Sequence, residues 1–399
     1  MFSEDHILYL NGNGSSKSIL AIGCKTNLTI ETENGAFDKF SMFINDNAKE
    51  YVFGYLGYDL KNDLEELSSE NAESIHMPIA YLFVPKHIAY ISDDRVNELL
   101  KGDQNVIENQ LIEIKGKTES KSLKKDQILS SITKESYLQK IAKIKQHIHQ
   151  GDIYEANFCY PFKSENIELN PLGVYQKLNR KTIAPFSVYA QFNDYFVLSA
   201  SPERFVKKEG NKVISQPIKG TIKRGGTSEE DQLLIDTLAS NQKDRSENVM
   251  IVDLVRNDLS RIAKPSSVKV EELCKIYTFK NIHQMISTVT AEVGDVSIVD
   301  VLKALFPMGS MTGAPKIRAM QLMEQYEEHK RGLYSGCIGY FAPNGDFDFN
   351  VVIRTILYNR KEKKLSFSVG GAITDLSLPE QEYEETLLKA EALIQALTE

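Results

Sequence analysis

The sequence predicts an α+β fold built on antiparallel sheet, from two hairpin signals and from the absence of a parallel nucleotide-binding pattern. Strand-like runs at 187–191 and 195–200 flank Asn193-Asp194, and a second pair of runs flanks Asn344-Gly345, the strongest hairpin signal in the chain. No P-loop and no strand–Gly-x-Gly-x-x-Gly–helix unit occurs. The two hairpin signals and the lack of these units favour an α+β fold with antiparallel sheet over a doubly wound parallel fold.

The composition is that of a large globular protein. The chain has 399 residues, of which 42% are hydrophobic and 26% charged, enough to bury a substantial core. A net charge of -8 argues against a nucleic-acid partner, because neutralising phosphates needs a basic face. No apolar run approaches the roughly twenty residues that span a bilayer, so no membrane partner is expected. Residues 1–5 show no secretory leader, which predicts a cytoplasmic location.

The four cysteines are far apart in the sequence, and none lies in a Cys-x-x-Cys spacing. They are Cys24, Cys159, Cys274 and Cys337. This pattern predicts reduced core thiols and makes a zinc site improbable.

The first third of the chain alternates short strands with turns. Residues 11–16 (Asn-Gly-Asn-Gly-Ser-Ser) form a turn cluster, and residues 81–84 are typical of a buried strand. Residues 114–126 are polar and lysine-rich, which predicts a linker or an exposed excursion. We therefore divide the chain into regions 1–125 and 126–399 and expect the two to form one intertwined unit.

Helices and further strands alternate in the second region. A helix begins after Thr133 and ends at Gly151, and others begin near Thr227 or cover 244–261 and 379–397. Ser377-Leu378-Pro379-Glu380 predicts a capping box with proline in the first turn of the last helix. The expected strands of an antiparallel meander are 336–341, 347–358 and 365–369.

A constrained lysine is the first chemical candidate. Lys219 lies between Pro217 and Gly220, sixteen residues after Glu203 of the run Ser201-Pro202-Glu203. If the two side chains meet, Glu203 supplies the acid that an amine nucleophile needs when its leaving group is poor. A lysine in a Pro/Gly turn is more often a solvated surface charge.

Two acidic pairs are the second candidate. Asp244 and Glu247, and likewise Glu382 and Glu385, are three residues apart on expected helices, so each pair shares a helix face. Four converging carboxylates require a cation, and Mg²⁺ suits an all-oxygen site. The alternative is that acids near helix starts only complement the helix dipole.

Several groups downstream suit an anion. Arg354 lies in an apolar strand pattern, where its guanidinium needs a carboxylate, either of a ligand or of a structural salt bridge. Gly370-Gly371-Ala372 ends a strand with little bulk, which brings backbone N–H groups close to a ligand or marks a bulge. Lys389 reaches the same cleft or pairs with Glu385 one helical turn away.

The chain resembles the chorismate-utilising enzymes over about residues 130–399, because several motifs occur in that family's order. These motifs are Ser201-Pro202-Glu203, Pro217-Ile218-Lys219-Gly220-Thr221, Asp244-Arg245-Ser246-Glu247-Asn248, Val252-Asp253-Leu254-Val255-Arg256-Asn257-Asp258, Thr312-Gly313-Ala314-Pro315-Lys316, Gly332-Leu333-Tyr334-Ser335-Gly336, Val369-Gly370-Gly371-Ala372 and Glu382-Tyr383-Glu384-Glu385. The N-terminal region resembles the family through residues 53–60. The resemblance implies a chorismate-binding fold like that of anthranilate synthase component I, with large antiparallel sheets packed together, helices outside and the catalytic region at 126–399.

The lysine at position 219 distinguishes branches of this family. Anthranilate-forming chains typically have alanine there, whereas Pro-Ile-Lys-Gly-Thr is found in chains that aminate chorismate at C4. The resemblance therefore implies that ammonia replaces the C4 hydroxyl, on the route to 4-aminobenzoate and folate. Lys219 as a neutral amine would add at C2 and Glu203 would protonate the departing hydroxyl, but nearby carboxylates favour the ammonium form of Lys219.

The resemblance also assigns ligand groups. Glu247 and Glu385 would bind Mg²⁺ directly, and Asp244 and Glu382 would act through its waters. The residues expected to hold the substrate are Arg354, Tyr334, Gly370, Gly371, Ala372, Lys389, Thr221, Thr312 and Glu155.

Two further positions carry open alternatives. His283 matches the family's active-site histidine, although a lone histidine is more often a hydrogen-bonded core residue. Glu155 stands where amine-using branches have glutamine and where isochorismate- and salicylate-forming enzymes have a lysine base, so it argues against the latter activities. It leaves open how this pocket wall treats ammonia, and it is itself a possible base.

The expected partner is a separate glutamine amidotransferase subunit that supplies ammonia, since none of the four cysteines lies in a nucleophile-elbow context. Three other interpretations stay open: amination at C2 to give anthranilate, a non-catalytic chorismate-binding subunit, and a structural protein with acidic helix faces.

Overall fold

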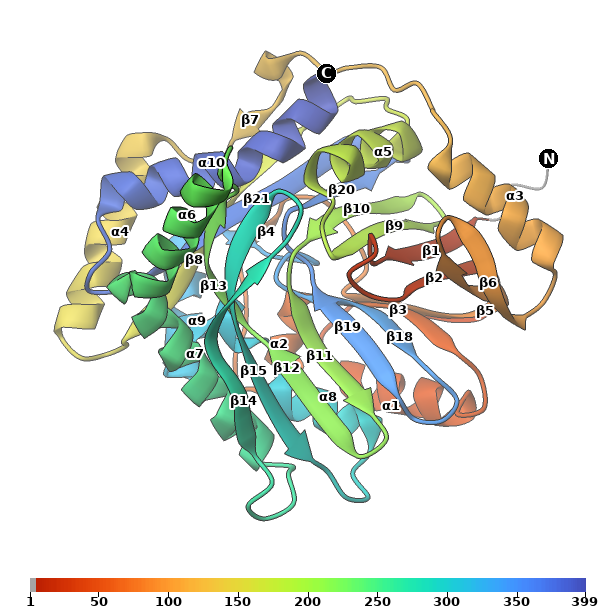
Figure 1. Ribbon diagram of the computed structural model, residues 1–399, viewed down its shortest axis with the longest axis horizontal. Helices are drawn as coiled ribbons and strands as arrows, with labels where there is room; N and C mark the ends of the chain where they lie inside the picture. The colour runs from red at the N-terminus through yellow and green to blue at the C-terminus, as the bar shows by residue number, and fades with distance from the viewer. Residues whose placement is uncertain (1–4) are drawn as a thin grey trace.

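A computed structural model describes residues 5–399 (Figure 1). The expectation that there is no secretory leader rests on residues 1–5, and residues 1–4 lie outside the described residues. One long antiparallel sheet bends back on itself in two arms. The first arm, in order of pairing, is β2 (Ser18–Ile30), β5 (Ala80–Ser92), β3 (Val52–Leu56), β18 (Cys337–Phe341), β19 (Phe347–Val351), β11 (Arg204–Glu209), β12 (Lys212–Gln216), β15 (Ile282–Glu292) and β14 (Lys269–Thr278).

The second arm continues from β2 in the other direction. Its strands are β1 (His6–Asn11), β9 (Phe186–Phe192), β10 (Tyr195–Ser201), β20 (Thr355–Asn359), β21 (Lys364–Ile373) and β8 (Glu155–Ser164). Shorter or flanking strands are β6 (Arg95–Lys101), β7 (Leu129–Ser130), β13 (Ile218–Lys223) and β16 (Gly313–Ala314), while β4 (Ala72–Glu73) and β17 (His329–Lys330) pair in parallel.

The inner faces of the two arms pack together, and helices cover the outer faces. Val188 and Val197 of the second arm meet Phe53 and Ile338 of the first in one buried cluster. The helices over the second arm are α4 (Lys134–His149), α5 (Pro171–Thr182), α9 (Lys316–Glu327) and α10 (Pro379–Thr398), while α3 (Gln104–Lys115) lies against β5 and β6. Those over the first are α1 (Ala36–Asp46), α7 (Gln242–Ser260) and α8 (Ile298–Leu305), with α6 (Ser228–Ser240) beside β13 and the short α2 (Lys61–Leu64) after β3. The predicted α+β class with packed antiparallel sheets is therefore confirmed.

Helix starts that depend on neighbouring residues agree with the sequence. The Thr133 hydroxyl accepts a hydrogen bond from the Ser136 amide at 3.2 Å at the start of α4, and Gly151, with φ of 81°, follows its end. The Thr227 hydroxyl accepts one from the Glu230 amide at 3.2 Å and so begins α6.

Two expectations near the C-terminus are wrong. The run 347–358 is two strands, β19 and β20, broken at 352–354, where Arg354 has a φ of 50°. β19 pairs with β11 and β18 whereas β20 pairs with β10 and β21, so the chain changes sheet arm there and forms no simple meander. Ser377 also does not cap α10, because its hydroxyl accepts from the Thr374 amide at 3.1 Å and Leu378 takes the cap position.

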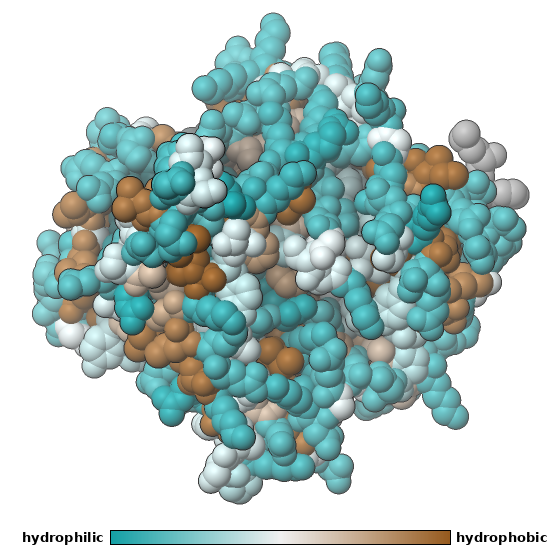
Figure 2. Space-filling model, viewed as in Figure 1, coloured by the Kyte–Doolittle hydropathy of each residue, from teal (hydrophilic) through white to brown (hydrophobic). Residues whose placement is uncertain are grey.

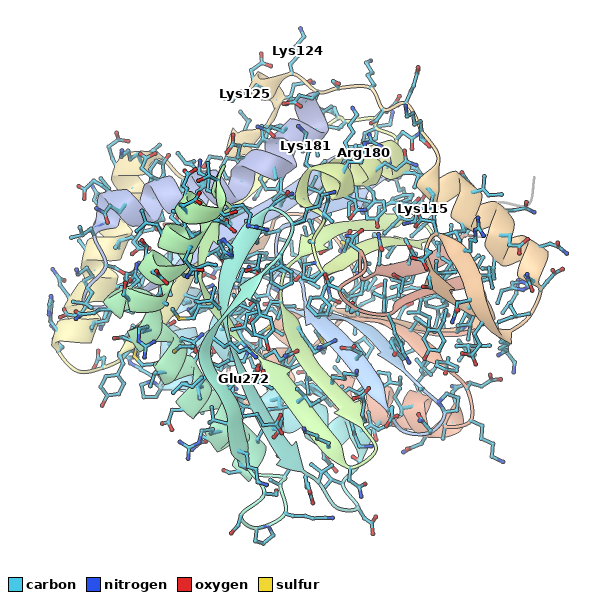
Figure 3. The ribbon with its side chains drawn as sticks, in the orientation of Figure 1. Lys115, Lys124, Lys125, Arg180, Lys181 and Glu272 are labelled. Carbon is cyan, nitrogen blue, oxygen red and sulfur yellow. The ribbon has the colours of Figure 1, made fainter. Side chains whose placement is uncertain are left out.

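Strands from both sequence regions pair directly. Leu8 of β1 lies opposite Ala190 of β9, and Gly54 of β3 lies opposite Gly339 of β18. The lysine-rich segment after α3 runs over the surface, and Figure 3 shows Lys124 and Lys125 at the edge of the molecule. Its Leu123 is nevertheless buried and donates its amide to the Leu397 carbonyl at 2.8 Å, so the segment is attached to α10.

The cysteines and the surface complete the comparison. Within 5–399 no cysteine forms a disulfide, and Cys159, Cys274 and Cys337 are buried as expected whereas Cys24 is half-buried. The face drawn in Figure 2 is mostly hydrophilic, with apolar side chains in scattered groups. Among the described helices, none combines the length and the apolar character needed to cross a membrane.

Candidate active site

Lys219 points into the protein. It is the second residue of β13, only 9% of it is exposed, and its Nζ donates to Glu155 Oε1 at 2.7 Å. Gly220 follows with a φ of 85°, and a Cβ there would lie 2.9 Å from Cγ of Asp244. Glycine is thus required at 220 for backbone conformation and for the close approach of α7. The surface-lysine alternative is excluded by this burial.

Glu155 forms the opposite wall. It begins β8 and is paired with Ala314 of β16, and its side chain is 1% exposed. Within the described residues its second oxygen, Oε2, is buried without a hydrogen-bond partner. A buried carboxylate oxygen in this state costs about 1–3 kcal/mol, so it is a group that a ligand can satisfy.

The protonation states of the acid and the amine are opposed. Glu203, in the connection between β10 and β11, is buried, and burial raises its pKa to about 7 although the charge of Lys219 acts against this. Burial disfavours the charge of Lys219 too, but Glu155, Glu247 and Glu203 outweigh it and raise the pKa of Lys219 above its usual value. In this structure a glutamate that readily holds a proton therefore lies near a lysine ammonium.

The two acidic pairs face each other from α7 and α10. Glu247 and Glu382 are buried, and Lys243 lies between them with Nζ 2.5 Å from Glu382 Oε1 and 3.6 Å from Glu247 Oε1. Asp244 is half-buried beneath Gly220, and Glu385 is the more exposed member, paired with Lys389 at 2.7 Å. The expected convergence of the carboxylates is thus present.

The residues of this cluster fit a magnesium ion. Burial raises the pKa of Glu247 to about 7, and its Oε1 has no hydrogen-bond partner among the described residues. All the donors are carboxylate oxygens, which Mg²⁺ prefers. Lys243 is the resident cation in this arrangement, so the set already compensates one positive charge. Sequence reasoning missed Lys243, although its position four residues before Glu247 was a local signal of an ion pair.

Arg354 has the properties of an anion-binding group. It lies in the break between β19 and β20, and no carboxylate of the described residues lies within 4.0 Å of it, so the structural salt-bridge alternative finds no support. Burial lowers its pKa, against the opposing effect of Glu385 and Tyr334. Tyr334 is buried, and burial raises the pKa of its phenol. A guanidinium held without a partner favours a substrate carboxylate.

The glycine segment lies in the last four residues of β21, so it ends a strand as expected. Gly370 and Gly371 pair with Cys159 and Phe158 of β8, and Ala372 follows opposite Asn157. The Gly371 Cβ position is 3.6 Å from Glu382 Oε2 and 3.8 Å from Lys389 Nζ, so this segment adjoins the acidic cluster. Lys389 also donates to the Gly370 carbonyl at 2.9 Å. It therefore lies beside the glycine segment and is also paired with Glu385, so the two alternatives for this lysine are compatible.

The hydrogen bonds of Thr221, Thr312 and His283 go to residues other than Lys219. Thr221 is exposed on β13 and accepts from Gln284 Nε2 at 3.3 Å. Thr312 is buried, and its carbonyl accepts the Asn157 amide at 2.8 Å. His283 is fully buried, with Nδ1 2.9 Å from the Thr278 hydroxyl and Nε2 2.9 Å from Asp231 Oδ1. Both ring nitrogens are engaged as in a core histidine, and a catalytic role for His283 stays a prediction.

A second buried charge network escaped the sequence analysis. Arg331 donates to both oxygens of Glu327 at 2.9 and 2.6 Å and to the Asn157 carbonyl at 2.7 Å, and Glu327 also accepts the Cys159 amide. The Tyr58 ring stacks against the guanidinium, with Cζ of Arg331 4.5 Å from the ring centre. The network ties α9 to β8 directly behind the glycine segment of β21.

The fold is that of chorismate enzymes. Over 95% of this chain and 92% of the other, the structure superimposes with a TM-score of 0.78 on anthranilate synthase component I from Streptococcus pneumoniae TIGR4, at 24% sequence identity. The model of the family described as chorismate binding enzyme matches residues 5–395, and the protein belongs to this family.

Relatives of two names align over most of the chain. Aminodeoxychorismate synthase component 1 from Bacillus subtilis (strain 168) is 34% identical over 362 residues, 87% of this chain and 76% of the relative. Anthranilate synthase component 1 from Aquifex aeolicus (strain VF5) is 33% identical over 367 residues, 87% of this chain and 74% of the relative. The chain spans only about a third of the length of the plant aminodeoxychorismate synthases that it also matches.

Proposed function

We propose that this protein replaces the C4 hydroxyl of chorismate by ammonia and forms 4-amino-4-deoxychorismate, the reaction of aminodeoxychorismate synthase. The observation that carries the proposal is the buried Lys219, whose Nζ lies 2.7 Å from Glu155 and close to the proton-bearing Glu203. Relatives named for this activity share up to 44% of aligned residues, which supports it. A nucleophile and an acid side by side are what a poor leaving group requires.

Each covalent step has a group on this chain. Lys219, an ammonium at rest, first releases one proton to solvent. The lone pair of the resulting amine forms a bond to ring C2, the double bonds shift, and the C4–O bond breaks while Glu203 gives its proton to the oxygen, which leaves as water. Ammonia then forms a bond to C4, the shift reverses, and the C2–N bond breaks with its electron pair returning to Lys219. Because burial holds the proton on Glu203 near neutral pH, the acid is in the required form.

The substrate carboxylates are the counterparts of the unpaired charges. Arg354 and Tyr334 would hold one carboxylate, with the backbone of Gly370 and Gly371 beside it. Glu247 and Glu385 would hold Mg²⁺, helped by Asp244 and Glu382, and the ion would supply positive charge against the other carboxylate. Lys243 must then release Glu382, since two cations compete for one oxygen.

The partner and the location complete the proposal. Two aminodeoxychorismate synthases among the relatives are named component 1, and a glutamine amidotransferase subunit is the partner that would deliver ammonia. Ammonia is scarce in free solution, so delivery from such a subunit would raise its concentration at the site. A cytoplasmic location suits a chain whose cysteines form no disulfide within 5–399.

Mass spectrometry of the protein with chorismate and Mg²⁺ but no ammonia tests the proposal. We expect an adduct on the peptide that contains Lys219, and 4-amino-4-deoxychorismate once ammonium is added. Lys219→Ala should form neither while keeping the circular dichroism of the parent. Fluorescent anthranilate as the product of the unmodified chain would instead establish the alternative, amination at C2.

A further inference from the structure

We propose that Glu155 is the binding site of the incoming nitrogen nucleophile, which it takes as ammonium and deprotonates beside C4. The inference rests on the proposed function and assigns one step within it. Its starting point is a carboxylate with unequal oxygens: Oε1 accepts from Lys219 Nζ at 2.7 Å, and Oε2 has no partner among the described residues.

The two oxygens match the two nitrogens of the reaction. Lys219 attaches to ring C2 and the second nitrogen to C4, and these carbons stand in a 1,3-relation on the ring. One carboxylate likewise presents two oxygens side by side, so a group that faces the C2 nitrogen with Oε1 places Oε2 toward a nitrogen at C4. Ammonium has only hydrogen-bond donors, so it can supply the donor that the buried oxygen Oε2 lacks.

The other carboxylates nearby are committed elsewhere. Burial keeps a proton on Glu203, which makes it the acid for the departing hydroxyl, and Glu247 belongs to the metal set on α7. Lys219 from β13 pairs with Glu155, and the charge of Glu155 helps to raise the pKa of Glu247 on α7. The adjoining strand β16 consists of Gly313 and Ala314 and brings no titratable side chain. Glu155 is thus the carboxylate left to accept a proton from ammonium.

The proton transfer balances. One N–H bond of ammonium breaks, its electron pair stays on nitrogen, and the proton forms an O–H bond on Glu155. The ammonia so formed bonds to C4 as the C2–N bond breaks and its pair returns to Lys219. The proton on Glu155 makes up for the one that Glu203 gave to the departing water, so the site returns to its initial charge. A glutamine of the same size accepts a hydrogen bond but cannot take this proton.

Steady-state rates with two nucleophiles at several pH values test this step in the full chain with chorismate and Mg²⁺. Ammonium chloride supplies a nucleophile that is mostly protonated near neutral pH, and hydroxylamine supplies one that is mostly unprotonated. The ratio of kcat/KM for the two cancels the titration of Lys219 and Glu203, which both reactions share. We expect this ratio to stay flat with pH in the unmodified protein and to rise about tenfold per pH unit in Glu155→Gln, because that variant uses only free ammonia.

The controls separate the possible failures. Glu155→Asp keeps the carboxylate and should keep the flat ratio even if its rates fall, and Glu271→Gln removes an exposed carboxylate of β14 and should match the unmodified protein. Activity of Glu155→Gln with hydroxylamine near neutral pH shows that it is folded. Parallel ratios in Glu155→Gln and the unmodified protein would overturn the inference while leaving the proposed function standing. Absence of product with either nucleophile in the unmodified chain would overturn both.

Discussion

Burial disfavours the charged form of both Glu203 and Lys219, but Glu203 is held neutral whereas Lys219 stays charged. It penalises both charges, yet the three carboxylates around Lys219 outweigh it and Lys219 keeps its proton. At Glu203 burial outweighs the opposing effects of Ser310, Lys219 and the Ile218 backbone, so that Glu203 takes a proton at a pKa of about 7. The pair therefore rests with the acid prepared and the nucleophile blocked. We infer that substrate binding must release Lys219 from Glu155 before the amine attacks.

The pH dependence of Glu203→Gln tests the role of this acid. The variant should lose at least about a hundredfold in product formation, because a positioned general acid contributes roughly that much. In the unmodified protein the rate should fall above about pH 7, where Glu203 loses its proton. Glu209→Gln, an exposed change at the end of β11, should keep the parent profile. Full activity of Glu203→Gln would assign the acid elsewhere.

Stability supplies an independent readout of the same group. The folded-state pKa of about 7 lies above the usual 4.5, so the folded protein binds more protons than the unfolded chain between these values. Glu203 therefore lowers the free energy of unfolding as pH rises through that window. Urea denaturation at pH 5 and pH 8 should show a smaller loss of stability in Glu203→Gln than in the parent. Equal losses in both proteins would place the titration on another group.

The acidic cluster makes a prediction about metal affinity. Glu247→Gln should weaken Mg²⁺ binding at least about tenfold, because it removes a charged oxygen that no protein donor satisfies. Isothermal titration with Mg²⁺ in the absence of chorismate measures this without reference to activity. Glu384→Gln, an exposed change on the same helix as Glu382, is the matched control. Unchanged affinity in Glu247→Gln would support the interpretation that these acids only complement helix dipoles.

At the scale of single elements, local signals were readable from the sequence and distant pairings were not. The caps at Thr133 and Thr227 span three residues, so residue types alone predict them. The break at 352–354 arises because β19 pairs with β11 and β20 with β10, strands about 150 residues away in sequence. An unbroken apolar pattern does not predict such distant pairings. The meeting of α7 with α10 followed from family order, not from periodicity, and Lys243 between them was overlooked.

The break between β19 and β20 gives Arg354 its strained, unpaired position, and this has opposite consequences for stability and binding. Arg354→Met should raise the melting temperature of the ligand-free protein by a few degrees, because it removes a half-buried charge that lacks a carboxylate partner among the described residues. The same change should raise KM for chorismate at least about tenfold through loss of a charged hydrogen bond. Arg256→Met, on the exposed side of α7, should change neither quantity. Normal KM in Arg354→Met would remove this residue from the substrate site.

For the molecule as a whole, strands of the regions 1–125 and 126–399 pair directly in one sheet. β1 supplies the pairing edge of β9, β3 supplies that of β18, and Phe53 and Ile338 share the core between the arms. A fragment of residues 126–399 would expose both edges and that apolar face at once. We expect this fragment to remain unfolded or to aggregate, whereas the whole chain should unfold in one calorimetric transition with matching calorimetric and van't Hoff enthalpies. Co-expression with 1–125 should restore folding, because the lost contacts are noncovalent. A fragment that folds alone and binds Mg²⁺ would show that the active-site arm needs no support from the N-terminal strands, and the chain would then be two domains.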